Sequence, residues 1–163
     1  MENYELFVLL GTNEGNRKKN LADALLKLEN TIGPIVKKSS IYQTSAWGKT
    51  DQMDFLNQAI CFVTKIPSKG ILNLIHQIEE SLGRVRMVKW GERIIDIDIL
   101  YAGNQIIDEA SLQIPHPQIP NRRFTLVPLN EIASDFIHPV LNKTTKEMLQ
   151  DCMDNLAVTL FKH

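Results

Sequence analysis

Two aspartates separated by one residue, Asp96 and Asp98, are the side chains best suited to do chemistry in this sequence. They lie in the alternating stretch 94–102, which predicts a β-strand, so both carboxylates share one face with Cα atoms roughly 6.6–7 Å apart. The same alternation places Tyr101 on the opposite face. Two carboxylates so close together repel one another unless a cation lies between them, and aspartate is disfavoured inside strands. The pair therefore predicts a site for Mg²⁺, which prefers oxygen ligands and shares its coordination shell with substrate phosphates. The alternative is a sheet with one solvated face, on which aspartate only supplies polarity.

A basic loop comes directly before these aspartates. Arg84, Arg86, Lys89 and Arg93 stand against the single anion Glu92, which gives a local charge of +3 in a chain whose net charge is −1. Arginine side chains beside carboxylates that bind magnesium suit a polyphosphate ligand, because the metal bridges some phosphate oxygens and the guanidinium groups bind others. The alternative is an ordinary solvated basic loop.

Three other features of the sequence do not predict a site. Residues 48–50 resemble the end of a P-loop, but Gln43 stands where that motif requires glycine. The two glycines of 11–15 lack the dinucleotide-binding pattern and favour a tight turn. His76 lies on the exposed side of a predicted helix with no third ligand nearby, so zinc is not predicted there.

The elements that must position these residues follow from the apolar periodicity. In chain order they are a strand over 5–10 that ends in a turn-prone loop at Gly11, a helix over 16–32, strands over 35–47 and 55–66, a helix over 67–82, a strand over 94–102 with a short returning partner at 105–107, an extended segment over 115–120, helices over 124–132 and 144–152, and a closing strand over 156–161. This order predicts an α+β fold of the ferredoxin-like βαββαβ type, an antiparallel sheet with helices on one face and additional C-terminal helices and a strand.

The composition predicts one domain over residues 1–163. A chain of 163 residues that is 44% hydrophobic and 23% charged can bury a sufficient core without disulfides or a structural metal. The near-zero net charge gives no global attraction to nucleic acid or to a membrane surface. Two distant cysteines, Cys61 and Cys152, form no disulfide framework, and Glu2 and Glu5 stand where a signal peptide has basic residues. We therefore expect a cytoplasmic protein.

Residues 89–100, with the pattern K-x-G-E-R-x-x-D-I-D-I-L, resemble the signature of the 6-hydroxymethyl-7,8-dihydropterin pyrophosphokinase family. Further matches to that family occur in order along the whole chain, at 11–13, 40–44, 54–57, 83–86, 115–117 and 122–124. The resemblance implies a folate-pathway enzyme that transfers diphosphate from ATP to the hydroxymethyl group of the pterin and releases AMP. We also expect a monomer that binds neither nucleic acid nor membranes.

The resemblance implies a role for each matching residue. Asp96 and Asp98 hold two Mg²⁺ ions that bridge the ATP phosphates, and together with Arg84 and Arg93, which arrive on a closing loop, they form the catalytic set. The ATP-binding residues are Glu79, Arg84, Arg86, Trp90, Arg93, Ile99, His116 and Arg122. The pterin-binding residues are Thr44, Ser45, Trp47, Phe55, Asn57, Trp90 and Phe124. The sequence departs from the family where Ser45 and Glu92 replace frequent prolines. His76 and Gln118 are left out of the implied site.

The residue types agree with these roles. Phe55 and Phe124 can stack on the two faces of a flat heteroaromatic ring, and Asn57 can hydrogen-bond its polar edge. Core packing is the alternative for each phenylalanine. No strong base is evident near the acceptor hydroxyl, so positioning and charge neutralisation should supply most of the rate. One rival is a non-catalytic ferredoxin-like module that binds nucleotide or RNA, but such a domain needs basic and aromatic residues where this strand carries aspartates. A second rival is an enzyme that transfers only the γ-phosphate.

Overall fold

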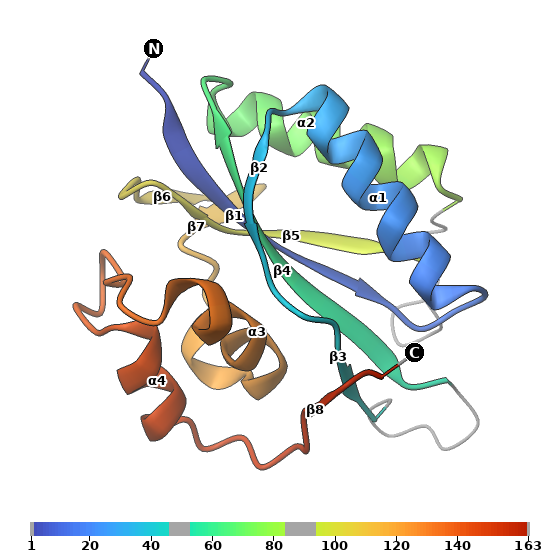
Figure 1. Cartoon of the computed structure of the whole chain (residues 1–163). Helices are drawn as coiled ribbons and strands as arrows, with labels where there is room; N and C mark the ends of the chain where they lie inside the picture. The colour runs from blue at the N-terminus through green and yellow to red at the C-terminus, as the bar shows by residue number, and fades with distance from the viewer. Residues whose placement is uncertain (1, 46–52, 84–93, 163) are drawn as a thin grey trace.

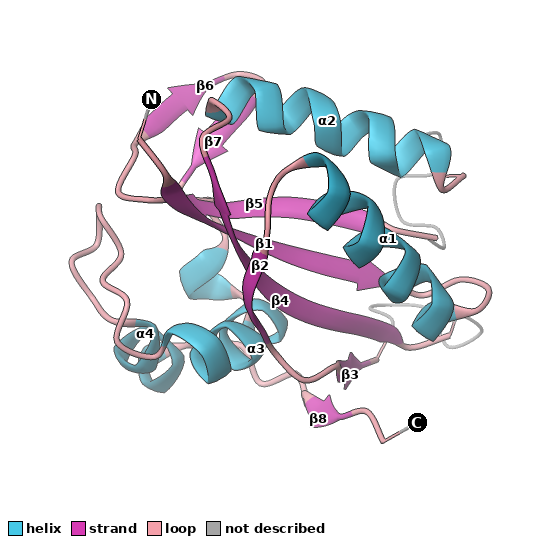
Figure 2. Ribbon diagram, turned by 45° about the horizontal axis from the view of Figure 1, so that its top comes forward, coloured by secondary structure: helices cyan, strands magenta, loops and turns pink. Residues whose placement is uncertain are grey.

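The computed structural model describes residues 2–45, 53–83 and 94–162. Within them the elements are β1 (Tyr4–Thr12), α1 (Arg17–Thr31), β2 (Ile35–Lys38), β3 (Tyr42–Thr44), β4 (Phe55–Thr64), α2 (Ser68–Ser81), β5 (Asp96–Ala102), β6 (Ile107–Glu109), β7 (Leu112–Ile114), a 3₁₀ turn (Ile119–Asn121), α3 (Arg123–Ala133), α4 (Thr145–Asp151) and β8 (Thr159–Leu160). A six-stranded antiparallel sheet has the order β5-β1-β4-β3-β8, and β2 also pairs with β4. Helices α1 and α2 cover one face and α3 and α4 the other (Figures 1 and 2). The predicted mixed fold with an antiparallel sheet is confirmed.

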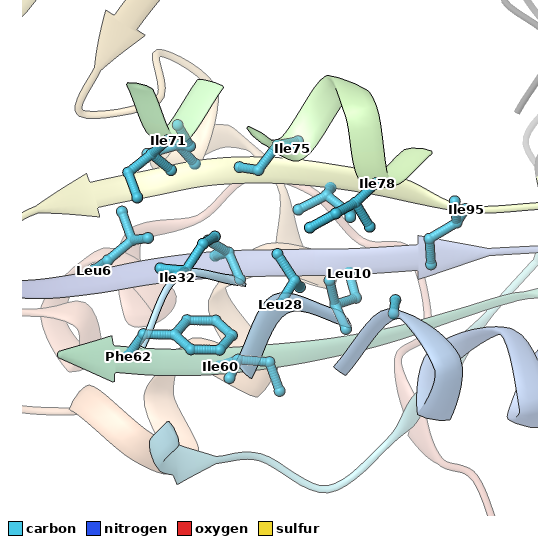
Figure 3. Packing of buried hydrophobic residues seen from close by; sticks show 14 of the residues in the cluster. Leu6, Leu10, Leu28, Ile32, Ile60, Phe62, Ile71, Ile75, Ile78 and Ile95 are labelled. Atoms are coloured by element: carbon cyan, nitrogen blue, oxygen red, sulfur yellow. The ribbon is translucent and has the colours of Figure 1, made fainter. Parts of the chain in front are cut away.

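The face of the sheet under α1 and α2 holds the larger apolar core. Leu6 and Leu10 of β1 are fully buried against Leu28 of α1 and Ile75 of α2 (Figure 3). Apolar residues recur in α1 at three- and four-residue spacing, so one stripe of the helix faces the sheet. Asn16 begins this helix, because its side chain accepts a hydrogen bond from the backbone N–H of Lys19 at 3.1 Å. Both predicted helices, 16–32 and 67–82, are confirmed.

The opposite face carries a second apolar cluster beneath α3 and α4. Phe7 and Leu9 of β1 pack there against Leu126 and Leu129 of α3. The two helices expected beside the sheet, α1 and α2, share one face, and the sequence assigned no face to the additional C-terminal helices. The C-terminal helices cover the other face because β1 is apolar on both sides, and two buried faces need two covering layers.

A β-bulge in β5 corrects the predicted position of Tyr101. Phe7 pairs with Tyr101 and Val8 pairs with Ile99, so Leu100 is an extra residue in this strand. Leu100 and Tyr101 consequently both belong to the cluster under α3, together with Phe7. One extra residue inverts the alternation that a regular strand would keep. Tyr101 thus lies on the same face of the sheet as the two aspartates.

Two other strand predictions are wrong at their ends. The first strand continues through Gly11 to Thr12, since Gly11 pairs with β4 and with β5. Residues 105–107 do not return along β5. Instead β6 pairs with β7 in a separate two-stranded sheet, and the outer edge of β5 is occupied by other groups: the Glu79 carboxylate accepts from the N–H of Ile97, and the N–H of His116 donates to the carbonyl of Leu100.

The extended segment predicted over 115–120 is wrong in its second half, where residues 117–118 form a turn and Ile119–Asn121 the 3₁₀ turn. The other elements are near their predicted places. The strand predicted over 35–47 is divided into β2 and β3, because the hydroxyl of Ser39 between them accepts a hydrogen bond from the N–H of Ala59. Helices α3 and α4 confirm the predictions over 124–132 and 144–152, and the closing strand is reduced to β8. None of the described helices is both long enough and apolar enough to cross a bilayer.

The packing of α1 gives a first prediction. Leu28→Ala should lower the free energy of unfolding by about 2–5 kcal/mol, because Leu28 is fully buried and its truncation leaves a cavity. Leu26 on the same helix is 61% exposed, so Leu26→Ala is a matched control that should cost less than about 1 kcal/mol. Urea unfolding of both variants measures the difference. Equal losses would contradict the assignment of the α1 stripe.

Candidate active site

Four residues from four neighbouring strands lie in one row across the sheet, on the α3 face. The register pairs Asp96 with Gly11, Gly11 with Asn57, and Asn57 with Tyr42. Neighbouring strands are 4.7–4.9 Å apart, so Asp96 and Asn57 are separated by about 10 Å. Gly11, between them, carries no side chain. The amide of Asn57 reaches over Gly11, since a Cβ there would lie 2.9 Å from its Nδ2, so no side chain of β1 separates the carboxylate from the amide in this row.

Asp96 and Asp98 are both half-buried at the start of the edge strand β5. They share one face of the strand, as predicted, because the bulge lies beyond them at Leu100. Their donor set is two carboxylates, and the described residues contain no group of three or more side chains that could hold a metal ion. A pair of hard oxygen ligands fits a cation that completes its shell from water and substrate oxygens.

An open cleft of about 380 Å³ runs along the outer edge of β5. Asp96 and Asp98 line it from the strand, and Glu79 of α2 and His116 line it from either side. Ile99, predicted to contact the nucleotide, also lines this cleft. Its volume falls within the range of small-molecule sites, which is roughly 300–1,000 Å³.

Two polar side chains of this cleft have defined backbone partners. The buried carboxylate of Glu79 accepts the N–H of Ile97 at 2.9 Å, an edge-strand donor that would otherwise lack a strand partner. His116 accepts the N–H of Gln118 on Nδ1 at 3.1 Å, so the neutral imidazole carries its proton on Nε2. Burial lowers the pKa of His116, the positive charge of Arg122 lowers it further, and Asp96 opposes this. His116 therefore offers the cleft an uncharged N–H donor at neutral pH.

On β3 and β4 the structure brings together three of the predicted pterin-binding residues. Thr44 pairs with Phe55, and Asn57 lies two residues further along β4 on the same face. Thr44 and Asn57 are buried, and Phe55 is half-buried. The Asn57 Nδ2 donates to the carbonyl of Leu10 at 3.2 Å, but its Oδ1 is buried with no hydrogen-bond partner in the described structure. A buried acceptor without a partner costs about 1–3 kcal/mol, so its presence points to a ligand that donates to it.

The start of α3 supplies two more predicted residues. Phe124 is half-buried at the edge of the second apolar cluster, and the guanidinium of Arg122 lies 5.6 Å from the centre of its ring. Ser45 is exposed directly after β3. The other predicted site residues, Trp47, Arg84, Arg86, Trp90 and Arg93, lie outside the described residues.

Two features of the site were missed from the sequence. Glu131 of α3 accepts hydrogen bonds from the backbone N–H of Ser40 at 2.9 Å, from its hydroxyl at 3.3 Å and from the Tyr42 hydroxyl at 2.6 Å, which fastens α3 to the strand beside Asn57. Burial and Glu131 raise the pKa of Tyr42 to about 12. These partners are 89 to 91 residues apart, so no local pattern links them. His76, predicted to be exposed, is instead half-buried in the cleft.

Comparisons with known proteins cover most of the chain. A family model described as 7,8-dihydro-6-hydroxymethylpterin-pyrophosphokinase (HPPK) matches residues 7–134. The chain is 44% identical over 142 residues to the 2-amino-4-hydroxy-6-hydroxymethyldihydropteridine pyrophosphokinase of Methylorubrum extorquens, which covers 86% of this chain and 88% of that protein. It is 40% identical over 157 residues to the Haemophilus influenzae protein of the same name, at 94% and 96% coverage. It is 35% identical to the folic acid synthesis protein fol1 of Pneumocystis carinii, of which it spans 21%.

The fold also resembles solved structures. A crystal structure of Plasmodium falciparum HPPK-DHPS superposes with a TM-score of 0.76 over 92% of this chain, at 20% identity. The match covers 44% of that longer chain. At this identity the likeness shows the shared fold alone.

The environment of His116 predicts a pH dependence of stability. Because its folded pKa lies below the unfolded value of about 6.5, the unfolded chain binds the proton more readily, and the stability present above pH 6.5 is lost as the pH falls below it. His138, whose pKa is also lowered by burial, contributes in the same direction. His116→Gln cannot be protonated, so its urea midpoint should fall less between pH 7.5 and pH 5.5 than that of the wild type. An equal fall would show that His116 is not held neutral.

Proposed function

The chain belongs to the 7,8-dihydro-6-hydroxymethylpterin-pyrophosphokinase family, and we propose that the row across its sheet and the cleft beside β5 form its active site. The enzyme transfers diphosphate from ATP to the hydroxymethyl group of 6-hydroxymethyl-7,8-dihydropterin and releases AMP, a reaction of folate biosynthesis. The single observation that carries the assignment is the register of the row. It places the backbone of Asp96 about 10 Å from that of Asn57, with Gly11 between them, and the buried Oδ1 of Asn57 has no partner in the described structure.

The pterin lies over β4 in this proposal. Phe55 of β4 and Phe124 of α3 stack on its two ring faces, and Asn57 and Thr44 hydrogen-bond its polar edge. The support is the shared face of Thr44, Phe55 and Asn57 and the buried acceptor that Asn57 presents. Ser45, Trp47 and Trp90 complete the proposed pterin set.

ATP lies along the cleft at the edge of β5. Its base and sugar lie near Glu79 and Ile99, and its phosphates lie near His116 and Arg122. The cleft supports this orientation, because Glu79, Ile99 and His116 line it together with the two aspartates, and His116 offers a neutral N–H donor there. The remaining proposed phosphate ligands are Arg84, Arg86, Trp90 and Arg93.

Asp96 and Asp98 are proposed to hold Mg²⁺, with two ions expected. Two half-buried carboxylates on one strand face fit a hard divalent cation that shares substrate oxygens. When bound, the metal neutralises the negative charge of the phosphates. The chain itself then contributes orientation: Asn57 and the phenylalanines hold the acceptor hydroxymethyl in line with the β-phosphorus, and Arg84 and Arg93 stabilise charge on the phosphates.

We also propose that residues 1–163 act as one domain with a ferredoxin-like core. Its support is the sheet order β5-β1-β4 with β2 and β3 beside β4, and the two apolar clusters that share β1 and β4. A cytoplasmic location is part of the same proposal, supported by the two free cysteines, Cys61 and Cys152.

One assay tests the function. The protein is incubated with ATP, Mg²⁺ and 6-hydroxymethyl-7,8-dihydropterin, and the nucleotide products are separated. AMP and the pterin diphosphate are expected. ADP as the product would indicate transfer of the γ-phosphate alone, and the absence of turnover with intact binding would indicate a binding module.

The aspartate pair gives a direct test of the metal site. Asp96→Asn or Asp98→Asn should lower turnover by at least ~10²-fold, because the cation loses a charged ligand. Unfolding temperature without Mg²⁺ should change little or rise, since one of two repelling charges is removed. Kinetics and thermal melts on the same preparations separate the two effects. A variant with near-normal turnover would remove that aspartate from the metal site.

Phe124 tests the stacking assignment. Phe124→Ala should weaken pterin binding by roughly 1–3 kcal/mol through loss of one stacking face, while ATP binding changes little. Calorimetry with each ligand alone measures both affinities. Phe136→Ala, in the same apolar cluster, is a control that should lower stability without this selectivity for pterin. Equal losses for both ligands would identify Phe124 as a core residue.

A further inference from the structure

A side chain at Gly11 would collide with the amide of Asn57, its neighbour in the row. A Cβ placed on this residue would lie 2.9 Å from the Nδ2 of Asn57. Ordinary van der Waals contacts begin at 3.4 Å, so the amide would have to move by roughly 0.5 Å or more. The atom that this Cβ would contact belongs to a side chain and not to backbone. The strands can therefore accept an alanine at residue 11, but the amide of Asn57 has to move.

The orientation of the Asn57 amide is set by its neighbour on the other side. The carbonyl of Leu10 accepts from Nδ2 at 3.2 Å, and the reversed amide would place two oxygen acceptors against each other. Oδ1 therefore faces away from this carbonyl, buried and without a partner in the described structure. It can only accept, so it selects a ligand that presents an N–H or O–H donor.

We propose that Gly11 is a positioning residue that acts through Asn57. Its missing side chain keeps the amide where Nδ2 bonds Leu10 and Oδ1 is presented to the ring of the acceptor substrate. The inference rests on the pterin site proposed above. Binding sites must be held within about 0.5 Å of their productive geometry, which is the size of the shift that a Cβ at residue 11 imposes.

A double-mutant cycle tests the coupling. Gly11→Ala should weaken binding of 6-hydroxymethyl-7,8-dihydropterin by roughly 5- to 50-fold, because the buried acceptor loses its aligned donor. Binding of ATP with Mg²⁺ should change less than about twofold. In the Asn57→Ala background the same Gly11→Ala change should have almost no further effect on pterin affinity, since the group through which Gly11 acts is gone.

A second glycine provides the control. Gly70 lies in the first turn of α2, where a Cβ would meet only the side chain of Ile66 at 3.0 Å, and Gly70→Ala should leave both ligand affinities unchanged. Thermal melts confirm that each variant is folded before its affinities are compared. In steady-state assays Gly11→Ala should raise the KM for the pterin more than the KM for ATP.

Each contrary result has a distinct meaning. If the wild type binds the pterin and Gly11→Ala binds it equally well, the role of Gly11 is wrong while the proposed function stands. If Gly11→Ala weakens pterin binding as strongly in the Asn57→Ala background, it does not act through the amide, and the inference is overturned. Equal weakening of ATP and pterin also overturns it. A wild type that binds no pterin removes the proposed function itself.

Discussion

The pairing of β1 between β4 and β5 is the constraint on which the rest of the structure depends. Its register sets Gly11 opposite Asn57 on one side and Asp96 on the other. A slip of one residue would turn every side chain of β1 to the other face, exchanging Leu10 for Gly11 at the centre of the site. Because β1 is apolar on both faces, the close packing of its side chains, and not their polarity, opposes such a slip. The strand that forms both cores thus also fixes the distance between carboxylate and amide.

The two faces of the sheet differ in where they carry apolar core residues and where they carry residues of the proposed site. The face under α1 and α2 is mostly apolar, and its burial supplies much of the stability. The opposite face is apolar only where α3 and α4 cover it, and it becomes polar beyond them, at Asn57 and Asp96. The bulge at Leu100 lies where β5 passes from the polar part of this face to the apolar part. It allows Tyr101 to pack under α3, while Asp96 and Asp98 stay on the same face as the row. Glu131 then fastens α3 to β3, so the ring of Phe124 is carried on a helix with a fixed place.

Local patterns in the sequence predicted most of the elements and the acid pair of the candidate site. The apolar stripes of α1 and α2 could be predicted because helix periodicity depends on neighbours within four residues. Asp96 and Asp98 were predicted to converge because they lie two residues apart on one strand. The resemblance to a family added the roles of residues far apart in sequence, such as Thr44 and Phe124, which no local rule could connect.

The sequence by itself determined the α+β class, the helices, the acid pair and the family. Only the tertiary structure decided that Tyr101 joins the aspartate face, that β6 pairs with β7, that His76 lines the cleft and that Gly11 borders the Asn57 amide. Each of these depends on contacts between segments far apart in the chain. The bulge forms where β5 pairs with β1, and Glu79 and His116 bind the outer edge of β5 in place of another strand. The close approach at Gly11 depends on the pairing of β1 with β4. Side-chain periodicity specifies which face a residue can occupy, but pairing between strands decides what it meets there.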